Sequence, residues 1–527
     1  MDTVFALFPV VALIWSMTKA RPLTAHVALP LAALCAVLIQ WGYFQADALT
    51  LSANIIAGGL AVLTPVSIIA GAILLNRVLV ISGAEQTLRQ WLAGISPNPV
   101  AQLMVIGWAF AFMLEGASGF GTPAAIAAPI LVGLGFPALP VALLTLVMNS
   151  VPVSFGAVGT PAWFGFAGLA LAAPLRLEVA QWTALIHLCA SFVIPVIALR
   201  WLVSWREIWQ NSGFILISIV SCTAPFFLIA QINDEFPSLL GGAIGLLISI
   251  WMAKLGVGLH QTAPVTDRSS IKPPSNYALV QALLPFVLLI IILLVTRIPS
   301  WPFKGWLNDT SLWWQFGAIE VSRALVVAWP NILGTNVDWS YKALYVPAII
   351  PFVLTVAIMS PILSLSKSQV YQASAETWGR LKRPILALMG ALIMVSVMMQ
   401  GAENAPIFVI ANALASVVGA NWAYVAALLG ALGSFFSGSA TVSNLTFGGI
   451  QLTIATQTGL PVSVILALQS VGAAMGNMVC LNNIIAVASI LGIQNQEGAM
   501  IKQTLKPLLI YAVVAALLGQ VILAWLI

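Results

Sequence analysis

Glycine, hydroxyl and amide residues gather in two short segments of an otherwise apolar chain. Residues 115–123 read EGASGFGTP, and residues 437–444 read SGSATVSN. Glycine permits turns that a Cβ atom forbids, and proline removes a backbone donor. A helix that breaks at such a segment in hydrocarbon must turn its freed backbone groups toward protein or a water-filled cavity. Both segments therefore predict the tips of re-entrant hairpins, near 112–137 and near 435–460, that line a small-molecule site.

The polar groups of these segments suit a small hydroxy acid. Helices that begin after such tips direct backbone N–H groups and a positive dipole end into the cavity, which favours a carboxylate. A buried amide requires partners and can bind a hydroxyl and a carboxylate oxygen together. The alternative interpretation is that small residues at helical spacing only allow helices to pack closely. The candidate substrate-binding residues are Ser118, Gly119, Thr122, Asn149, Ser150, Asn404, Ser437, Gly438, Ser439, Thr441, Ser443, Asn444, Gln469, Asn477 and Asn482.

Three ionisable residues are candidates for carrying a proton, because charged groups within membrane spans are costly and mark functional sites. Glu115 stands at the entrance to the first tip, and Glu403 directly precedes Asn404. Either carboxyl could take up a proton, since burial disfavours its charged form. His187 lies within an apolar stretch and could shuttle protons. The structural alternatives are that Glu403 caps the following helix at the membrane surface and that His187 is a hydrogen-bonded packing residue.

Composition indicates that membrane helices must position these residues. Of the 527 residues, 61% are hydrophobic and only 7% are charged, which excludes a soluble globular protein. Apolar stretches long enough to span a bilayer recur from end to end, and we expect an all-α polytopic membrane protein with about twelve transmembrane helices plus the two re-entrant hairpins. The net charge of +5 comes from basic residues between the spans, so it indicates orientation and no nucleic-acid partner. The four cysteines stand singly, and we expect no metal site and no cofactor.

The order of polar segments predicts the topology. We expect the chain to lie in the inner membrane of the cell. Lys and Arg residues mark cytoplasmic loops, and the alternation of these loops along the chain places both termini outside the cytoplasm. A polar segment at 258–276 predicts a cytoplasmic linker between a first transmembrane half at 1–257 and a second at 277–527. The stretch at 297–342 is rich in Trp, which favours the headgroup layer, and predicts an interfacial hairpin.

An internal repeat relates the two halves. Gly83-Ala84-Glu85 recurs as Gly401-Ala402-Glu403, and each copy is followed by an apolar span, a Gly/Ser/Thr-rich break, an apolar return and a second polar break at Asn149 or Gln469. The flanking charges give the two copies opposite directions across the membrane. Inverted repeats with interrupted helices are typical of secondary transporters. The first tip is our candidate for the proton and part of the carboxylate site, and the second for hydroxyl-rich substrate contacts.

The segments EGASGFGTPAAIAAPILVGLGFP, NSVPVSFGAVGTP, SGSATVSNLTFGGIQ and QSVGAAMGNMVCLNNIIAVASILG resemble the lactate permease family of bacterial secondary carriers. The resemblance covers nearly the whole chain. It implies proton-coupled uptake of L-lactate, D-lactate or glycolate, and kinship with a larger group of ion transporters that have paired re-entrant hairpins. Some members have a Pro-His pair where this chain has Leu481 and Asn482. A proton-coupling scheme based on a histidine there fails for this chain, which makes Glu115 the better proton candidate.

Other classes of function remain open at this point. A sodium-coupled organic-anion carrier or a sodium/proton antiporter on the same inverted repeat would use Ser, Thr and Asn as oxygen ligands, and uptake in sodium-free buffer separates these from a proton symporter. An anion channel would share the helix-end anion site but could not concentrate its substrate. An enzyme is disfavoured because no nucleophile, base and orienting group occur in a recognisable combination. We expect a monocarboxylate, a proton and membrane lipid as partners, and the sequence leaves monomer and homodimer open.

Overall fold

The chain forms two compact units, and each unit combines one segment from the first part of the chain with one from the second. Unit 1 comprises Met1–Leu88 and Pro274–Ile410, and unit 2 comprises Arg89–Pro273 and Ala411–Ile527. The units therefore do not coincide with the expected halves, and the expected linker at 258–276 lies mostly outside the described residues. The computed structural model describes residues 1–18, 23–119, 122–260, 274–297, 301–346, 349–401, 404–493 and 496–526.

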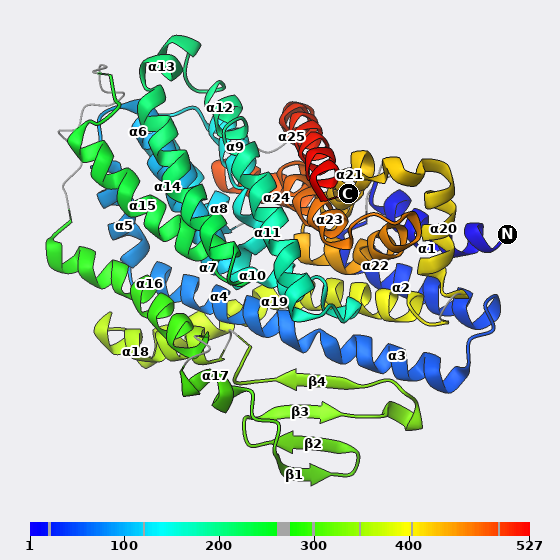
Figure 1. Cartoon of the computed structure of the whole chain (residues 1–527). Helices are drawn as coiled ribbons and strands as arrows, with labels where there is room; N and C mark the ends of the chain where they lie inside the picture. The colour runs from blue at the N-terminus through cyan, green and yellow to red at the C-terminus, as the bar shows by residue number, and fades with distance from the viewer. Residues whose placement is uncertain are drawn as a thin grey trace. The chain divides into compact units, whose positions relative to one another are not determined.

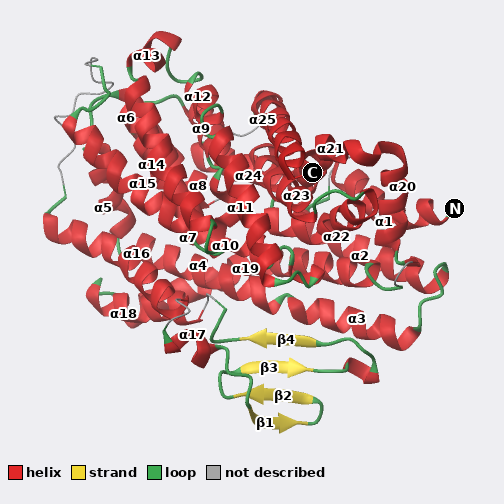
Figure 2. Cartoon of the chain, viewed as in Figure 1, coloured by secondary structure: helices red, strands yellow, loops and turns green. Residues whose placement is uncertain are grey.

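Helices make up most of both units (Figure 2). Within the described residues, ten helices are long and apolar enough to cross a membrane, or up to eleven if the bent pair Ala138–Met148 and Pro152–Leu169 forms one span. The expected count of about twelve is therefore not confirmed. The apolar helices Asp2–Met17 and Ile349–Ile362 fall short of the roughly 20 residues that a span requires. The protein is thus a multi-pass membrane protein.

Unit 1 is built from long helices and one small sheet. Helix α19 packs along α2, α3 and α4. The buried amide of Gln40 on α2 donates to the carbonyl of Val397 on α19 at 2.8 Å, so polar as well as apolar contacts fix this packing. The helices are α1 (Asp2–Thr18), α2 (Ala25–Gly42), α3 (Ala48–Ala61), α4 (Leu63–Ile81), α16 (Asn276–Arg297), α17 (Pro302–Leu307), α18 (Leu354–Ile362), α19 (Lys367–Met398) and the π-helix η6 (Ile349–Val353); α5 (Ala84–Ala93) and α20 (Pro406–Val418) connect the units along the chain.

A four-stranded antiparallel sheet corrects the expectation of an all-α chain. The strands lie in sequence order, β1 (Leu312–Phe316), β2 (Ile319–Ser322), β3 (Val326–Trp329) and β4 (Trp339–Lys342) (Figure 1). They fall in the Trp-rich stretch expected to form an interfacial hairpin. Aromatic and β-branched residues favour strands. Gly317 supplies the positive φ of 58° that the turn between β1 and β2 requires.

Unit 2 contains both segments that were predicted to form hairpin tips. Helix α7 packs against α8, α10 and α15, and α22 packs against α10, α21 and α23. The helical elements in the first chain segment of unit 2 are α6 (Pro99–Gln102), the π-helix η1 (Leu103–Phe110), α7 (Ala111–Ser118), α8 (Thr122–Gly133), α9 (Ala138–Met148), η2 (Pro152–Phe155), α10 (Gly156–Trp163), η3 (Ala167–Leu169), α11 (Ala173–Ala190), α12 (Ile194–Leu199), α13 (Trp205–Gln210), α14 (Ser212–Ala230) and α15 (Pro237–Leu255). The later elements are η8 (Gly419–Trp422), α21 (Ala423–Ser437), α22 (Ala440–Thr458), α23 (Val462–Gly476), η9 (Asn477–Val479), α24 (Leu481–Leu491) and α25 (Glu497–Leu526).

Candidate functional site

The first tip is a helix end inside unit 2. Helix α7 ends at Gly119, which has φ 57° and ψ −153°, a conformation that only glycine adopts readily. The backbone N–H of Gly119 donates to the carbonyl of Glu115 at 3.0 Å. The chain then returns through α8, and Phe120 and Gly121 lie outside the described residues. The predicted interruption of the helix is therefore present at the predicted glycine.

A buried carboxyl and a buried amide meet beside this helix end. The side chain of Glu115 is 2% exposed, and its Oε2 accepts a hydrogen bond from Nδ2 of Asn149 at 3.0 Å. Asn149 is 7% exposed, and its Oδ1 is buried without a hydrogen-bond partner. A Cβ built on Gly156 would lie 2.4 Å from Oε1 of Glu115, so only glycine leaves room for the carboxyl there. We call Glu115, Asn149, Gly119 and Gly156 the Glu115 cluster.

The backbone after Gly156 is strained. Ala157, Val158 and Gly159 all have positive φ values, of 44°, 56° and 71°. Left-handed residues other than glycine cost of the order of 1–3 kcal/mol each and persist only where the surroundings hold them. A Cβ on Gly119 would lie 3.0 Å from Cβ of Ala157, so the strained run touches the first tip directly. We call residues 149–163 the broken helix. It supplies the amide partner of Glu115 and places a strained backbone segment next to that carboxyl.

His187 joins a separate chain of buried hydroxyl groups. Oγ of Ser154 lies 2.8 Å from Nε2 of His187 and donates to the carbonyl of Ser470 at 3.0 Å. Because Ser154 has one hydroxyl proton, Nε2 of His187 donates to Ser154, and Nδ1 accepts from the hydroxyl of Tyr511. His187 and Tyr511 are both fully buried. With both ring nitrogens bonded, this arrangement favours the structural alternative for His187.

The second tip has the same backbone plan as the first. Helix α21 ends at Ser437, and Gly438 follows with a φ of 74°. The N–H of Gly438 donates to the carbonyl of Ser434 at 2.8 Å, as Gly119 does to Glu115. Ser439 then caps α22, with Oγ accepting from the N–H of Val442 at 3.3 Å. Side-chain and backbone hydrogen bonds therefore close this tip locally.

Buried side-chain amides next to the second tip are joined by hydrogen bonds. Nε2 of Gln469 donates to Oγ of Ser443 at 3.1 Å, and Oε1 of Gln469 accepts from Nε2 of Gln451 at 2.9 Å. Oε1 of Gln451 accepts from the indole N–H of Trp422 at 2.6 Å. Nδ2 of Asn444 donates to the carbonyl of Pro161 at 3.0 Å, which ties the second tip to the broken helix of the first. We call these residues the Gln469 network.

The other predicted site residues occupy varied positions. The hydroxyls of Ser118 and Ser150 donate to carbonyls of their own helices, at 2.9 Å and 2.7 Å. Thr441 is buried, and Asn477 accepts from the amide of Asn483. Asn482 is exposed and lies beside Gly438, where a Cβ would be 3.2 Å from its Nδ2.

Three further predicted residues are Asn404, Glu403 and Thr122. Asn404 is an exposed residue of unit 1. Glu403 and the side chain of Thr122 fall outside the described part of the chain. The roles predicted for these residues stay predictions.

Sequence reasoning missed four polar residues of unit 2. Ser154 and Tyr511 hold His187, and Gln451 holds Gln469. Ser434 is fully buried, and its Oγ has no hydrogen-bond partner. A signal existed for Ser434, since it stands four residues before the glycine that ends its helix, as Glu115 does.

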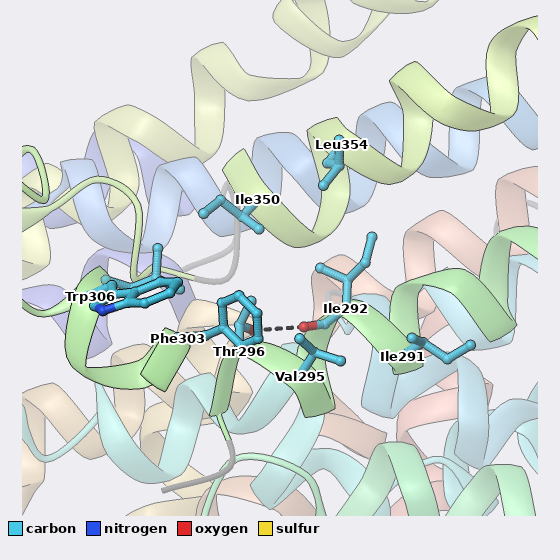
Figure 3. A pocket seen from close by; sticks show the side chains of 9 residues that line it. Ile291, Ile292, Val295, Thr296, Phe303, Trp306, Ile350 and Leu354 are labelled. Carbon is cyan, nitrogen blue, oxygen red and sulfur yellow. Dashed lines mark hydrogen bonds between the residues drawn. The ribbon is translucent and has the colours of Figure 1, made fainter. Parts of the chain in front are cut away.

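A cavity in unit 1 differs in chemistry from these polar clusters. It has a volume of about 290 Å³, and the hydroxyl of Thr296 among its lining residues donates to the carbonyl of Ile292 on the same helix at 2.8 Å (Figure 3). No charged group lines it, so it does not suit a carboxylate. The lining residues are Ile291, Ile292, Val295, Thr296, Phe303, Trp306, Leu307, Ile350 and Leu354. The residues described also contain no group of three or more His, Cys, Asp or Glu side chains arranged to hold a metal ion.

Comparison with known proteins assigns the chain to a family. The family model described as L-lactate permease matches residues 2–527. A protein of Haemophilus influenzae that is named provisionally as an L-lactate permease is 52% identical over 519 residues, covering 98% of this chain and 97% of that protein. The glycolate permease GlcA of Escherichia coli is 28% identical over 551 residues, covering 98% and 95%.

Among solved structures, the YdaH transporter of Alcanivorax borkumensis aligns over 99% of this chain and 96% of that chain, with 16% identity and a TM-score of 0.45. That similarity is too low to support conclusions about the site. The family match over residues 2–527 is sufficient by itself. The chain therefore belongs to the L-lactate permease family, and it is a membrane transporter rather than an enzyme.

Proposed function

We propose that the protein is a proton-coupled symporter that carries L-lactate, and related short 2-hydroxymonocarboxylates such as D-lactate and glycolate, through the inner membrane into the cell. Glu115 carries the proton. The observation behind this assignment is the Glu115 cluster, in which a buried carboxyl has one amide partner and that amide has an unused oxygen. A carboxyl in such surroundings binds a proton readily, because burial without a cation disfavours its charge.

Electrostatics explains why a proton accompanies the substrate. A lactate anion that enters against a negative-inside potential is opposed by about 2.3 kcal/mol per 100 mV, and one symported proton cancels this term. The described ion pair of unit 2 joins Arg176 to Asp234, whereas Glu115 accepts a hydrogen bond from the neutral Asn149. A proton can therefore neutralise Glu115 without breaking an ion pair.

The substrate class rests on the relatives and on the polar groups near the two tips. An L-lactate permease and a glycolate permease are both relatives of this chain, and lactate and glycolate share a carboxylate and a 2-hydroxyl. The unpaired Oδ1 of Asn149 and the unpaired hydroxyl of Ser434 are buried polar atoms in unit 2 that lack partners. Such atoms are costly to leave unsatisfied, and a polar ligand relieves that cost.

Replacing Glu115 by Gln tests the assignment. In proteoliposomes, Glu115→Gln should lose lactate uptake driven by a pH gradient but keep lactate counterflow, because exchange requires no net proton movement. Glu207→Gln is the matched control, since Glu207 is a half-buried capping residue of unit 2 and Gln can also form a capping box. Concentrative uptake by Glu115→Gln at the rate of the control would overturn the assignment.

A sodium-coupled carrier is the second candidate. The carboxyl of Glu115 and the unpaired Oδ1 of Asn149 are hard oxygen ligands of the kind that alkali and alkaline-earth cations prefer. Uptake in sodium-free buffer distinguishes the two. A requirement for sodium at constant pH gradient would favour this candidate over the proton symporter.

A further inference from the structure

We infer that Asn149 couples the proton to the substrate by turning its side-chain amide. When Glu115 is ionised, Nδ2 of Asn149 donates to Oε2 of Glu115. When Glu115 is protonated, the amide turns about its Cβ–Cγ bond, Oδ1 accepts from the carboxylic acid, and Nδ2 becomes free to bind the substrate carboxylate. The inference rests on the proposed function, because it assumes that Glu115 is the group that carries the proton.

The structure contains the hydrogen bond that the ionised arrangement requires. Asn149 caps the C-terminus of α9, directly before the broken helix. One end of its amide is used, since Nδ2 donates to Oε2 of Glu115 at 3.0 Å. The other end is idle, since Oδ1 is buried and has no partner. A buried acceptor without a donor costs roughly 1–3 kcal/mol, so this amide is poised to gain a partner.

The ionised arrangement disfavours an anionic substrate. An ionised carboxylate only accepts hydrogen bonds, and the amide must therefore present its N–H end to Glu115. The amide oxygen then points away from Glu115, into the position that we call the free position. A substrate carboxylate that approached this position would meet another acceptor as well as the charge of Glu115.

Protonation reverses this preference. The carboxylic acid of Glu115 gains an O–H donor, and the only acceptor of the Asn149 side chain is Oδ1. Turning the amide satisfies the acid and leaves the two N–H donors in the free position. A buried donor without an acceptor is again costly, and the substrate carboxylate supplies an acceptor with a charge-assisted hydrogen bond. Proton binding and substrate binding thus stabilise each other, as linkage requires.

The described elements that pack against α7 carry few ionisable side chains. Elements α8, α10, η1 and η2, which pack against α7, carry no ionisable side chain among their described residues. Helix α15 also packs against α7; it carries Lys254 in its last turn and is preceded by Asp234 and Glu235. Asp234 forms an ion pair with Arg176. The side-chain amide of Asn149 donates to the carboxyl of Glu115.

A purely structural role for Asn149 must be separated from this one. Removing Asn149 changes the environment of Glu115 and could alter pH dependence indirectly. The decisive comparison therefore uses Glu115→Gln, whose side-chain amide is permanently neutral and can donate to Oδ1 as the protonated acid would. In that background, Asn149 can affect lactate binding only through its contact with the substrate or through the fold.

The experiment measures L-lactate binding to the purified full-length chain in nanodiscs by calorimetry, in mildly acidic and in mildly alkaline buffer. The wild type should bind more weakly in alkaline buffer and take up a proton on binding. Glu115→Gln should bind equally in both buffers, with the acidic affinity of the wild type. The double variant Glu115→Gln/Asn149→Ala should bind about tenfold more weakly than Glu115→Gln alone, the effect of losing one hydrogen bond to a charged group.

Thr145→Val is the matched control. Thr145 is buried one turn earlier on α9, and its hydroxyl donates only to carbonyls of its own helix, Val141 at 3.0 Å and Ala142 at 3.1 Å. Its lactate affinity should stay within about twofold of wild type and should keep the pH dependence. If the Ala variants do not fold, Asn149→Leu, which preserves the side-chain volume better, replaces them in both backgrounds.

The outcomes separate this inference from the proposed function. Equal lactate affinities for Glu115→Gln and the double variant would overturn the amide switch while leaving Glu115 as the proton carrier. Concentrative, proton-driven uptake by Glu115→Gln would overturn the proposed function itself. A tenfold loss in the double variant, together with loss of proton uptake in Asn149→Ala, supports the switch.

Discussion

The two hairpin tips share a backbone plan but differ in chemistry. In each, a helix ends at a glycine with positive φ whose N–H caps the carbonyl four residues earlier, at Glu115 in the first tip and at Ser434 in the second. The first position holds a carboxyl bonded to an amide that has an idle oxygen. The second position holds a hydroxyl with no partner, backed by the Gln469 network.

This difference indicates that the equivalent positions Glu115 and Ser434 have different roles. The Glu115 cluster contains an ionisable group and an unused acceptor, and it adjoins the left-handed residues Ala157, Val158 and Gly159, so a single proton changes its hydrogen bonding. The Gln469 network is neutral, and its amides are bonded to one another and to the backbone. We propose that the first tip responds to protonation and that the second holds its shape while the substrate binds.

The largest effect should come from filling the space beside Glu115. Gly156→Ala introduces a Cβ that would lie 2.4 Å from Oε1 of Glu115, so the carboxyl must move. We expect proton-driven lactate uptake to fall by about 100-fold, the order of effect that displacing a functional group by about 1 Å produces. Gly133→Ala, at the end of α8, is the control, because its Cβ would meet nothing within 4 Å. If both variants transport equally well, the cluster is not essential to coupling.

An effect on stability rather than transport should follow from breaking the Gln469 network. Gln451→Leu removes the partners of the Trp422 indole and of Gln469 in a fully buried position. We expect the free energy of unfolding to fall by about 2 kcal/mol, since stranded buried polar groups cost roughly 1–3 kcal/mol. Denaturant titration in detergent measures this, with Thr456→Val on the exposed side of the same helix as control. A transport defect without loss of stability would assign the network a direct role in coupling.

The smallest effect should come from Ser434. Its hydroxyl has no hydrogen-bond partner, and the carbonyl of Gly430, one helical turn earlier, accepts from Ser443 at 2.7 Å. Ser434→Ala should therefore change the free energy of unfolding by less than about 0.5 kcal/mol, whereas Ser443→Ala should lower it by about 1 kcal/mol. The same denaturant titration compares them. A large loss of stability in Ser434→Ala would show that its hydroxyl is bonded after all, and the contrast between the tips would weaken.

The sequence predicted where the helices break but not how the breaks are held. Gly119 and Gly438 could be recognised because positive φ values favour glycine, and both lie where expected. The bond between Glu115 and Asn149 could not, because it joins residues 34 positions apart and depends on how α9 ends. The same holds for Tyr511, which is 324 positions from its partner His187.

Two features of the fold were not predicted from the sequence, namely the four-stranded sheet and the division into two units. The strands β1 to β4 are short and rich in Trp and Val, so a hydropathy pattern could indicate only that this stretch does not span. The division into two interleaved units was also hidden, because helix periodicity says nothing about which helices pack together. Contacts between residues far apart in sequence hold each unit together.

The interleaving of unit 2 has a consequence for biosynthesis. Ser470 and Tyr511, which hold Ser154 and His187, lie in α23 and in α25, the last helix of the chain. Ser154 and His187 leave the ribosome long before these partners exist. The hydrogen-bond chain through His187 therefore cannot be completed until α25 has been inserted, and truncation of α25 should leave Nδ1 of His187 without the hydroxyl of Tyr511.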